Sequence, residues 1–141
     1  MKKEDSYRRG RHVVFQLHAH IVFVPRYRNK IFDRDALDRL HRIFRVVCAD
    51  FETDVVEFNG ETDHIHLLIN YPPKICLSGL VNSLKGVSAR RLRQERKDIA
   101  SRYWNGGFWS ASYFVSSCGG APISILRQYI EQQKGSPSSP P

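Results

Sequence analysis

Cysteine is scarce in this sequence, and the spacing of the cysteines does not suit a disulfide framework or a metal site. The 141 residues include three cysteines, Cys48, Cys76 and Cys118, and no two of them form a CxxC pair. An odd number of widely spaced cysteines argues against a disulfide framework and against a cysteine zinc site. We therefore expect buried or incidental surface thiols.

Long hydrophobic runs are also missing. The longest apolar stretch, residues 13–24, is interrupted by Gln16, His18 and His20, whereas a membrane-spanning helix needs about 20 apolar residues. The charged N-terminus is not followed by the apolar region of a signal peptide. With 41% hydrophobic and 26% charged residues, the chain has the composition of an ordinary globular domain. We expect a cytoplasmic protein.

Acidic residues are few compared with basic ones. Twenty-two Lys and Arg against fourteen Asp and Glu give a net charge of +8, which suggests a polyanionic partner. Much of the excess lies in three clusters: Arg8, Arg9 and Arg11; Arg26, Arg28 and Lys30; and Lys85, Arg90, Arg91, Arg93, Arg96 and Lys97. Tyrosine and tryptophan residues lie near these clusters, and cations beside aromatics are typical of single-stranded nucleic-acid binding.

The order of apolar patterns predicts an α+β fold. Strand-like patterns cover residues 13–24, 52–59, 64–71 and 108–116, helical patterns begin after Asp33 or Asp35 and at Ser78, and a last helix runs to about Gln133. The second helix continues into the basic residues 90–97, and Asn59-Gly60 is a hairpin-turn signal. The order β-α-β-β-α-β-α predicts a ferredoxin-like (βαββαβ) antiparallel sheet with helices on one face plus a C-terminal helix. The other face would then be available for a ligand.

The chain is predicted to form one domain between two flexible ends. No internal repeat or linker divides it. We expect a flexible basic arm at residues 1–11, a single domain at 12–134 and a disordered Ser/Pro tail at 135–141.

The segment Asp63-His64-Ile65-His66-Leu67 is the strongest candidate for a metal site. Residues i and i+2 of a strand share a face with Cα atoms roughly 6.5–7 Å apart, so two imidazoles can converge on one metal. Ile65 and Leu67 would anchor the opposite face in the core. Two partly exposed histidines on a half-buried strand are the alternative interpretation.

A second pair, His18 and His20, has the same spacing on another predicted strand. Either this pair is a rival metal site, or His20 contacts the first pair without binding the metal itself. We prefer His64 and His66, which follow the hairpin signal within a stronger apolar alternation. His18 and His20 are then ordinary polar-face residues.

Tyr129 is the candidate nucleophile, one helical turn before Gln133. A tyrosine hydroxyl with a pKa near 10 is a poor nucleophile unaided, and a divalent cation would help by polarising a phosphate. The amide oxygen of Gln133 could complete the coordination. Spacing alone does not distinguish Tyr129 from the other five tyrosines. The alternative is that Tyr129 is an ordinary tyrosine of an amphipathic helix, with its ring packed and its hydroxyl in water.

Several motifs, in order, resemble the single-tyrosine HUH transposases (TnpA type) of small insertion sequences that move as single-stranded DNA. In an HUH motif two histidines flank a bulky hydrophobic residue, here Ile65. The similarity extends from about His20 to Gln133 and rests on residues 20–28 (HIVFVPRYR), 63–69 (DHIHLLI), 84–90 (LKGVSAR), 108–116 (FWSASYFVS) and 128–133 (QYIEQQ). Gly60-Glu61-Thr62 departs from the family, whose members usually have a Met-Pro turn there, and it adds a carboxylate at Glu61.

The resemblance implies a catalytic domain at 12–134. Tyr129 would attack a phosphodiester of single-stranded DNA and form a 5′-phosphotyrosine, and His64, His66 and Gln133 would hold Mg²⁺ or Mn²⁺. The partners would be DNA with hairpin ends and a second copy of the chain, with active sites shared between subunits. The predicted DNA-contacting residues are Arg8, Arg9, Arg11, Arg26, Arg28, Lys85, Ser88, Arg90, Arg91 and Arg93.

Two other classes of function remain open at this stage. One is a non-catalytic nucleic-acid-binding module on the same sheet, although the aromatic RNA-binding signature expected of such a sheet is absent. The other is a metal-dependent hydrolase in which water is the nucleophile and Tyr129 is structural. A domesticated relative that binds or processes chromosomal hairpins is a variant of the main interpretation.

Overall fold

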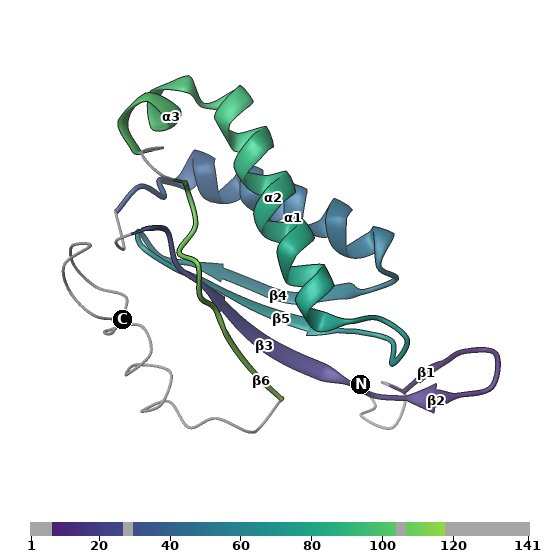
Figure 1. Cartoon of the computed structure of the whole chain (residues 1–141). Coiled ribbons are helices and arrows are strands. Elements are labelled where there is room, and N and C mark those ends of the chain that lie inside the picture. The colour runs from purple at the N-terminus through teal and green to yellow at the C-terminus, as the bar shows by residue number, and fades with distance from the viewer. Residues whose placement is uncertain (1–6, 27–29, 104–106, 118–141) are drawn as a thin grey trace.

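A four-stranded antiparallel sheet forms the base of the fold. The computed structural model describes residues 7–26, 30–103 and 107–117. Its elements are β1 (Arg8–Arg9), β2 (Val14–Phe15), β3 (His18–Phe23), α1 (Arg34–Asp50), β4 (Asp54–Gly60), β5 (Ile65–Asn70), α2 (Leu77–Glu95), α3 (Lys97–Tyr103) and β6 (Phe114–Ser117). The strand order is β4-β5-β3-β6 (Figure 1), which is the ferredoxin-like order predicted from the sequence.

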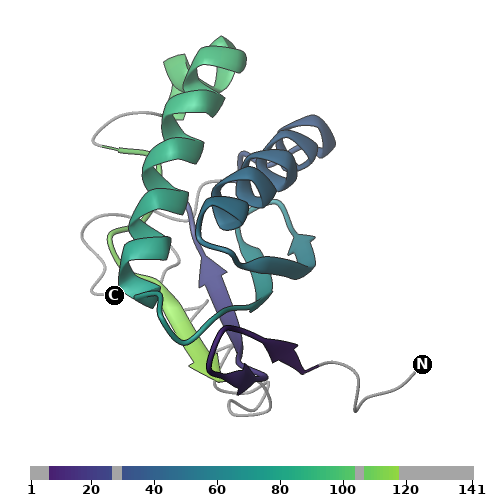
Figure 2. The ribbon, with the colours of Figure 1, turned by 90° about the vertical axis from the view of Figure 1, so that its right-hand side faces the viewer.

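The two long helices cover one face of this sheet (Figures 1 and 2). Alternate residues of β3 and β5 point toward them and are almost completely buried: Ala19, Ile21, Phe23, Ile65, Leu67 and Ile69. From the helices come Leu40, Ile43, Phe44, Val47, Leu80, Val81 and Leu84. Because strand side chains alternate, the intervening residues of β3 and β5 point to the opposite face. We call this the histidine face, since it carries His18, His20 and His66.

The first helix begins where the sequence predicts. Asp33 is its N-cap, and Asp33 Oδ1 accepts a hydrogen bond of 2.8 Å from the backbone N–H of Ala36. The prediction for the second helix is wrong by two residues. Cys76 occupies the N-cap without a side-chain capping bond, and the Ser78 hydroxyl instead lies 3.0 Å from Cys76 Sγ.

The turn between β4 and β5 also differs from the prediction. Asn59 and Gly60 pair with His66 and Ile65, so they belong to the ladder. The chain reverses at residues 61–64, where the N–H of Glu61 donates to the carbonyl of His64 over 2.9 Å. A Cβ at Gly60 would collide with the side chain of Leu37. A larger residue at position 60 would therefore require the side chain of Leu37 to shift.

The predicted first and last strands are shorter in the structure. Residues 13–24 divide into β2 and β3, and residues 108–116 supply only the start of β6. Phe108 and Trp109 instead enter the core, and Trp109 forms an isolated bridge with Pro25. Among the described residues, no helix is long and apolar enough to span a bilayer.

Part of the predicted flexible arm is held in place. Arg8 and Arg9 pair with Phe15 and Val14. The Arg8 guanidinium donates to the backbone oxygen of Asn70 over 3.1 Å and to its Oδ1 over 3.0 Å. At least residues 8–9 are therefore strand, which corrects the prediction of a flexible arm over 1–11.

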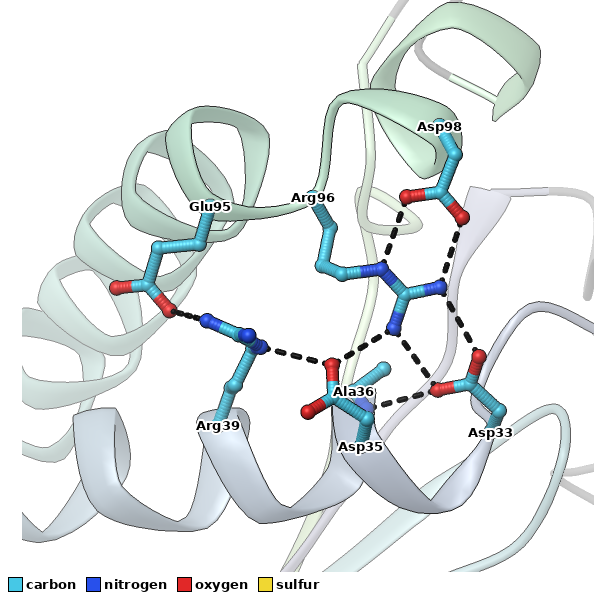
Figure 3. Close-up of polar contacts among 7 residues, drawn as sticks. All are labelled: Asp33, Asp35, Ala36, Arg39, Glu95, Arg96 and Asp98. Carbon is cyan, nitrogen blue, oxygen red and sulfur yellow. Dashed lines mark hydrogen bonds and ion pairs between the residues drawn. The ribbon is translucent and has the colours of Figure 1, made fainter.

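The predicted basic continuation of α2 is interrupted at Arg96, which the sequence assigned only to a charged cluster. Its guanidinium donates to the carboxylates of Asp33, Asp35 and Asp98 over 2.8–3.0 Å (Figure 3). These contacts join the start of α1 to the junction between α2 and α3.

Replacing this guanidinium, Arg96→Met, is expected to lower the melting temperature by a few degrees at pH 7, because three carboxylates lose their counter-charge. Arg96 holds the pKa of Asp33 below its usual range and lowers the pKa of Asp98 to about 2. Carboxylates with lowered pKa values stabilise the fold above pH 4 and lose that effect as the pH falls toward 2. Thermal melts should therefore show the difference from wild type shrinking between pH 5 and 2. Arg42→Met, at an exposed position of α1, is the control, and a pH-independent difference would contradict the assignment.

Candidate active site

The two histidines of the HUH motif lie next to each other at the start of β5. Ile65, between them, is fully buried, so the strand has a fixed orientation. The ring centroids of His64 and His66 are 4.9 Å apart, and the ring planes are nearly perpendicular at 82°. Both side chains are partly exposed. This arrangement has the proximity that a shared metal requires.

His64 is oriented by the residue before it. Its Nδ1 lies 2.8 Å from Asp63 Oδ1, and Asp63 is only 7% exposed. A carboxylate at this distance favours the proton on Nδ1 and leaves the Nε2 lone pair available. This carboxylate–histidine arrangement is typical of metal sites.

His66 contacts a histidine of the neighbouring strand. Its Nδ1 lies 3.3 Å from His20 Nε2, and the two ring centroids are 5.3 Å apart. Burial, and then the nearby His64 and His20, lower the pKa of His66 to about 4. His66 is therefore neutral at pH 7, and only a neutral imidazole can ligate a metal.

The described residues fit part of a metal site. Within residues 7–26, 30–103 and 107–117, no group of three histidine, cysteine or acidic side chains could hold a metal ion. Two imidazoles with Nδ1 already engaged would present Nε2 to a cation and need a further ligand. The predicted nucleophile Tyr129 and the predicted ligand Gln133 lie outside the described residues.

The two members of the other histidine pair contact different residues. His18 Nε2 lies 3.4 Å from Asn70 Nδ2, whereas His20 contacts His66. The two side chains thus have different partners. The choice of His64 and His66 over this pair as metal ligands stays a prediction.

The predicted DNA contacts fall into several groups. Side chains exposed to solvent are those of Arg9, Arg11, Arg90, Arg91 and Arg93, and Arg26 is partly exposed. Arg28 lies outside the described residues. The arginines of α2 come from the helical layer, whereas His66 lies on the opposite face of the sheet. The structure therefore does not bring these arginines next to the histidines.

Lys85 is half-buried, and its ammonium is engaged by backbone carbonyls. Its ammonium donates to the carbonyls of Ser110, Ala111 and Ser112 over 2.8–3.2 Å and lies 5.3 Å from the ring centroid of Tyr113. Burial lowers the pKa of Lys85. It anchors the segment that leads into β6.

Ser88 is fully buried, and its Oγ accepts a hydrogen bond of 3.0 Å from Trp109 Nε1. A DNA phosphate cannot reach a buried hydroxyl. Ser88 is therefore removed from the predicted DNA contacts, and the segment 84–90 acts here as a structural motif through Lys85 and Ser88.

The substitution Ser88→Ala is expected to lower the free energy of unfolding by about 1–3 kcal/mol, because it leaves the buried indole N–H without its acceptor. Urea unfolding measures this cost. In a Trp109→Phe background, which has no indole N–H, the same substitution should cost clearly less. Equal costs in both backgrounds would show that the bond does not contribute.

Asp63 is a residue of the site to which the sequence alone assigned no role. It is one of four polar residues, with Thr53, Asn70 and Ser88, in the buried set of the described chain. The available signal was an acidic residue directly before the first histidine. Glu61, the departure from the family pattern, is exposed two residues earlier, and its side chain has no assigned part in this geometry.

Comparison with known proteins shows the family to which this chain belongs. The model of the IS200-like transposase family matches residues 13–133. The chain is 29% identical over 126 residues to the ISDra2 transposase TnpA of Deinococcus radiodurans, covering 89% of this chain and 90% of the relative. It is 32% identical over 122 residues to the transposase of insertion sequence IS200 from Salmonella typhimurium, covering 86% and 80%.

Solved structures show the same fold. A crystal structure from Deinococcus radiodurans R1, assigned as a transposase, superposes with a TM-score of 0.82 at 27% identity, covering 92% of this chain and 99% of that one. A REP-associated tyrosine transposase bound to a REP hairpin gives a TM-score of 0.56 at 10% identity, covering 89% and 69%. With a family match across most of its length, the chain belongs to the IS200-like transposases.

Proposed function

We propose that this transposase cleaves and rejoins single-stranded DNA at insertion-sequence ends through a 5′-phosphotyrosine on Tyr129. The observation that carries the proposal is the pair His64 and His66, whose ring centroids lie 4.9 Å apart and whose Nδ1 atoms face Asp63 and His20. Membership of the IS200-like transposase family supports the proposal.

In the proposed reaction the Tyr129 hydroxyl attacks a DNA phosphorus atom. The new tyrosine–phosphorus bond replaces the bond to the 3′ oxygen, which leaves as a 3′-hydroxyl after taking a proton. One phosphodiester replaces another, so joining is the reverse reaction and needs no ATP. The chain contains no P-loop sequence, which is consistent with this chemistry.

His64, His66 and the amide oxygen of Gln133 would hold a divalent cation. Such a cation would neutralise developing charge on the scissile phosphate. Imidazoles alone would suit zinc or iron as well, so the choice of Mg²⁺ or Mn²⁺ rests on the family relationship. Comparing cleavage with each of the four metals would test that choice.

The proposed substrate is DNA with hairpin ends. A structural relative with 10% identity is bound to a REP hairpin, and exposed arginines at 9, 11, 90, 91 and 93 could contact phosphates. We also propose a homodimer in which the tyrosine helix of one subunit serves the histidines of the other. A strictly monomeric protein that cleaves DNA would contradict this arrangement.

The decisive experiment uses wild-type protein, labelled single-stranded DNA carrying a genuine element end, and Mg²⁺ or Mn²⁺. A denaturing gel is expected to show a covalent protein–DNA adduct, because the phosphotyrosine survives denaturation. The adduct should not form when a chelator removes the cation before the reaction. Hairpin binding without any adduct would favour a non-catalytic or domesticated hairpin-binding protein. Cleavage without an adduct would favour a metal-dependent hydrolase.

A further inference from the structure

The two proposed metal ligands have different partners at Nδ1. The partner of His64 is the Asp63 carboxylate at 2.8 Å, whereas the partner of His66 is His20 Nε2 at 3.3 Å. We infer that His20 is a positioning residue that orients His66 and fixes the ring nitrogen on which His66 carries its proton. This inference rests on the proposed metal site.

The position of His20 is set by the sheet. In the pairing of β3 with β5, His66 lies opposite Val22 and His20 lies opposite Leu68. His20 and His66 are therefore diagonal neighbours on the histidine face, a separation that aromatic side chains can bridge. The residues on both sides of His20, Ala19 and Ile21, are buried at 2% and 0% exposure. The backbone that carries His20 is thus held by the core.

The contact couples the tautomers of the two rings. When His66 Nδ1–H donates to the lone pair of His20 Nε2, the Nε2 of His66 is free to bind a metal. The reverse bond, from His20 Nε2–H to His66 Nδ1, would place the proton of His66 on Nε2 and block coordination. His20 can therefore support the site only with its own proton on Nδ1. The two rings form a coupled pair.

His18 offers a matched control on the same strand and the same face. Its Nε2 contacts Asn70 Nδ2 at 3.4 Å, and Asn70 Oδ1 accepts from Arg8. Because Oδ1 is the acceptor in that contact, the amide nitrogen is the group that donates to His18. Removing the His18 ring therefore changes a similar surface without touching a proposed ligand.

Manganese affinity tests the role directly. The variants are His20→Phe, which keeps a ring without an acceptor, His20→Gln, whose amide oxygen can accept, and His18→Phe. Titration followed by the EPR signal of free Mn²⁺ is expected to show about 10–100-fold weaker binding for His20→Phe, the usual effect of losing an orienting partner. His20→Gln should bind closer to wild type, and His18→Phe should match it. Melting temperatures identify a folding defect, in which case His20→Ser, which is too short to reach His66, replaces His20→Phe.

A metal-free measurement separates this inference from the proposed function. The ¹⁵N shifts of the His66 ring should report the Nδ1–H tautomer in wild type and a mixture in His20→Phe. Unchanged Mn²⁺ affinity together with an unchanged tautomer would overturn the inference. If wild type binds no Mn²⁺, the proposed metal site fails, and the His66 tautomer in the two proteins still decides whether His20 positions it.

Discussion

Tyr129→Phe is expected to abolish the covalent adduct and to lower strand cleavage by roughly 10³-fold or more, the scale seen when a covalent enzyme loses its nucleophile. The substitution removes one oxygen and keeps the ring. Hairpin binding should be unchanged, because binding depends on phosphate contacts elsewhere. A denaturing gel measures the adduct, and a native gel measures binding.

The control is Tyr71→Phe, which removes a hydroxyl directly after the far end of β5, away from His64. It should leave both cleavage and the adduct intact. Cleavage by Tyr129→Phe at the wild-type rate, with a free 5′ phosphate, would identify water as the nucleophile. The protein would then act as a hydrolase, and the proposed phosphotyrosine would be wrong.

The sheet and its helical layer could be predicted because each depends on local periodicity. Ile65, Leu67 and Ile69 alternate with more exposed residues, as a half-buried strand requires. The apolar stripe of α1, with Leu40, Phe44 and Val47, recurs at helical spacing. Such patterns also give the order of helices and strands along the chain, and that order predicts the ferredoxin-like topology.

Contacts between distant segments decided the details that the sequence did not predict. Asn59-Gly60 is a good turn in isolation, yet the ladder continues through it, and Leu37 of the distant helix α1 lies against Gly60. Ser88 and Lys85 lie on a helix whose basic composition suggested a DNA surface. Which of its faces would meet Trp109 and the loop at residues 110–112 depended on tertiary packing.

The local part of the candidate site could be predicted, and its long-range contacts could not. The spacing of His64 and His66 was sufficient to place both rings near one point, and the structure gives a centroid separation of 4.9 Å. The contact from His20 to His66 joins residues 46 positions apart. It depends on strand register, which a single sequence does not specify. The roles of Tyr129 and Gln133 stay predictions.

His66→Ala is expected to weaken Mn²⁺ binding by at least about 100-fold, more than the loss of an orienting partner, because it removes a ligand itself. His64→Ala should have a comparable effect. With the metal lost, the adduct should fall below detection at Mn²⁺ concentrations that saturate wild type. Free Mn²⁺ measured by EPR gives the affinity, and the denaturing gel gives the adduct.

His12→Ala is the matched control, since His12 is an exposed histidine in the β1–β2 hairpin. It should bind Mn²⁺ and form the adduct as wild type does. High Mn²⁺ concentrations should partly restore the adduct in His66→Ala if the remaining His64 still holds the cation weakly, because mass action offsets a lost ligand. Tight Mn²⁺ binding in both single variants would show that this pair does not hold the metal. The histidines would then be side chains of a half-buried strand, and the ligands would have to lie elsewhere in the chain.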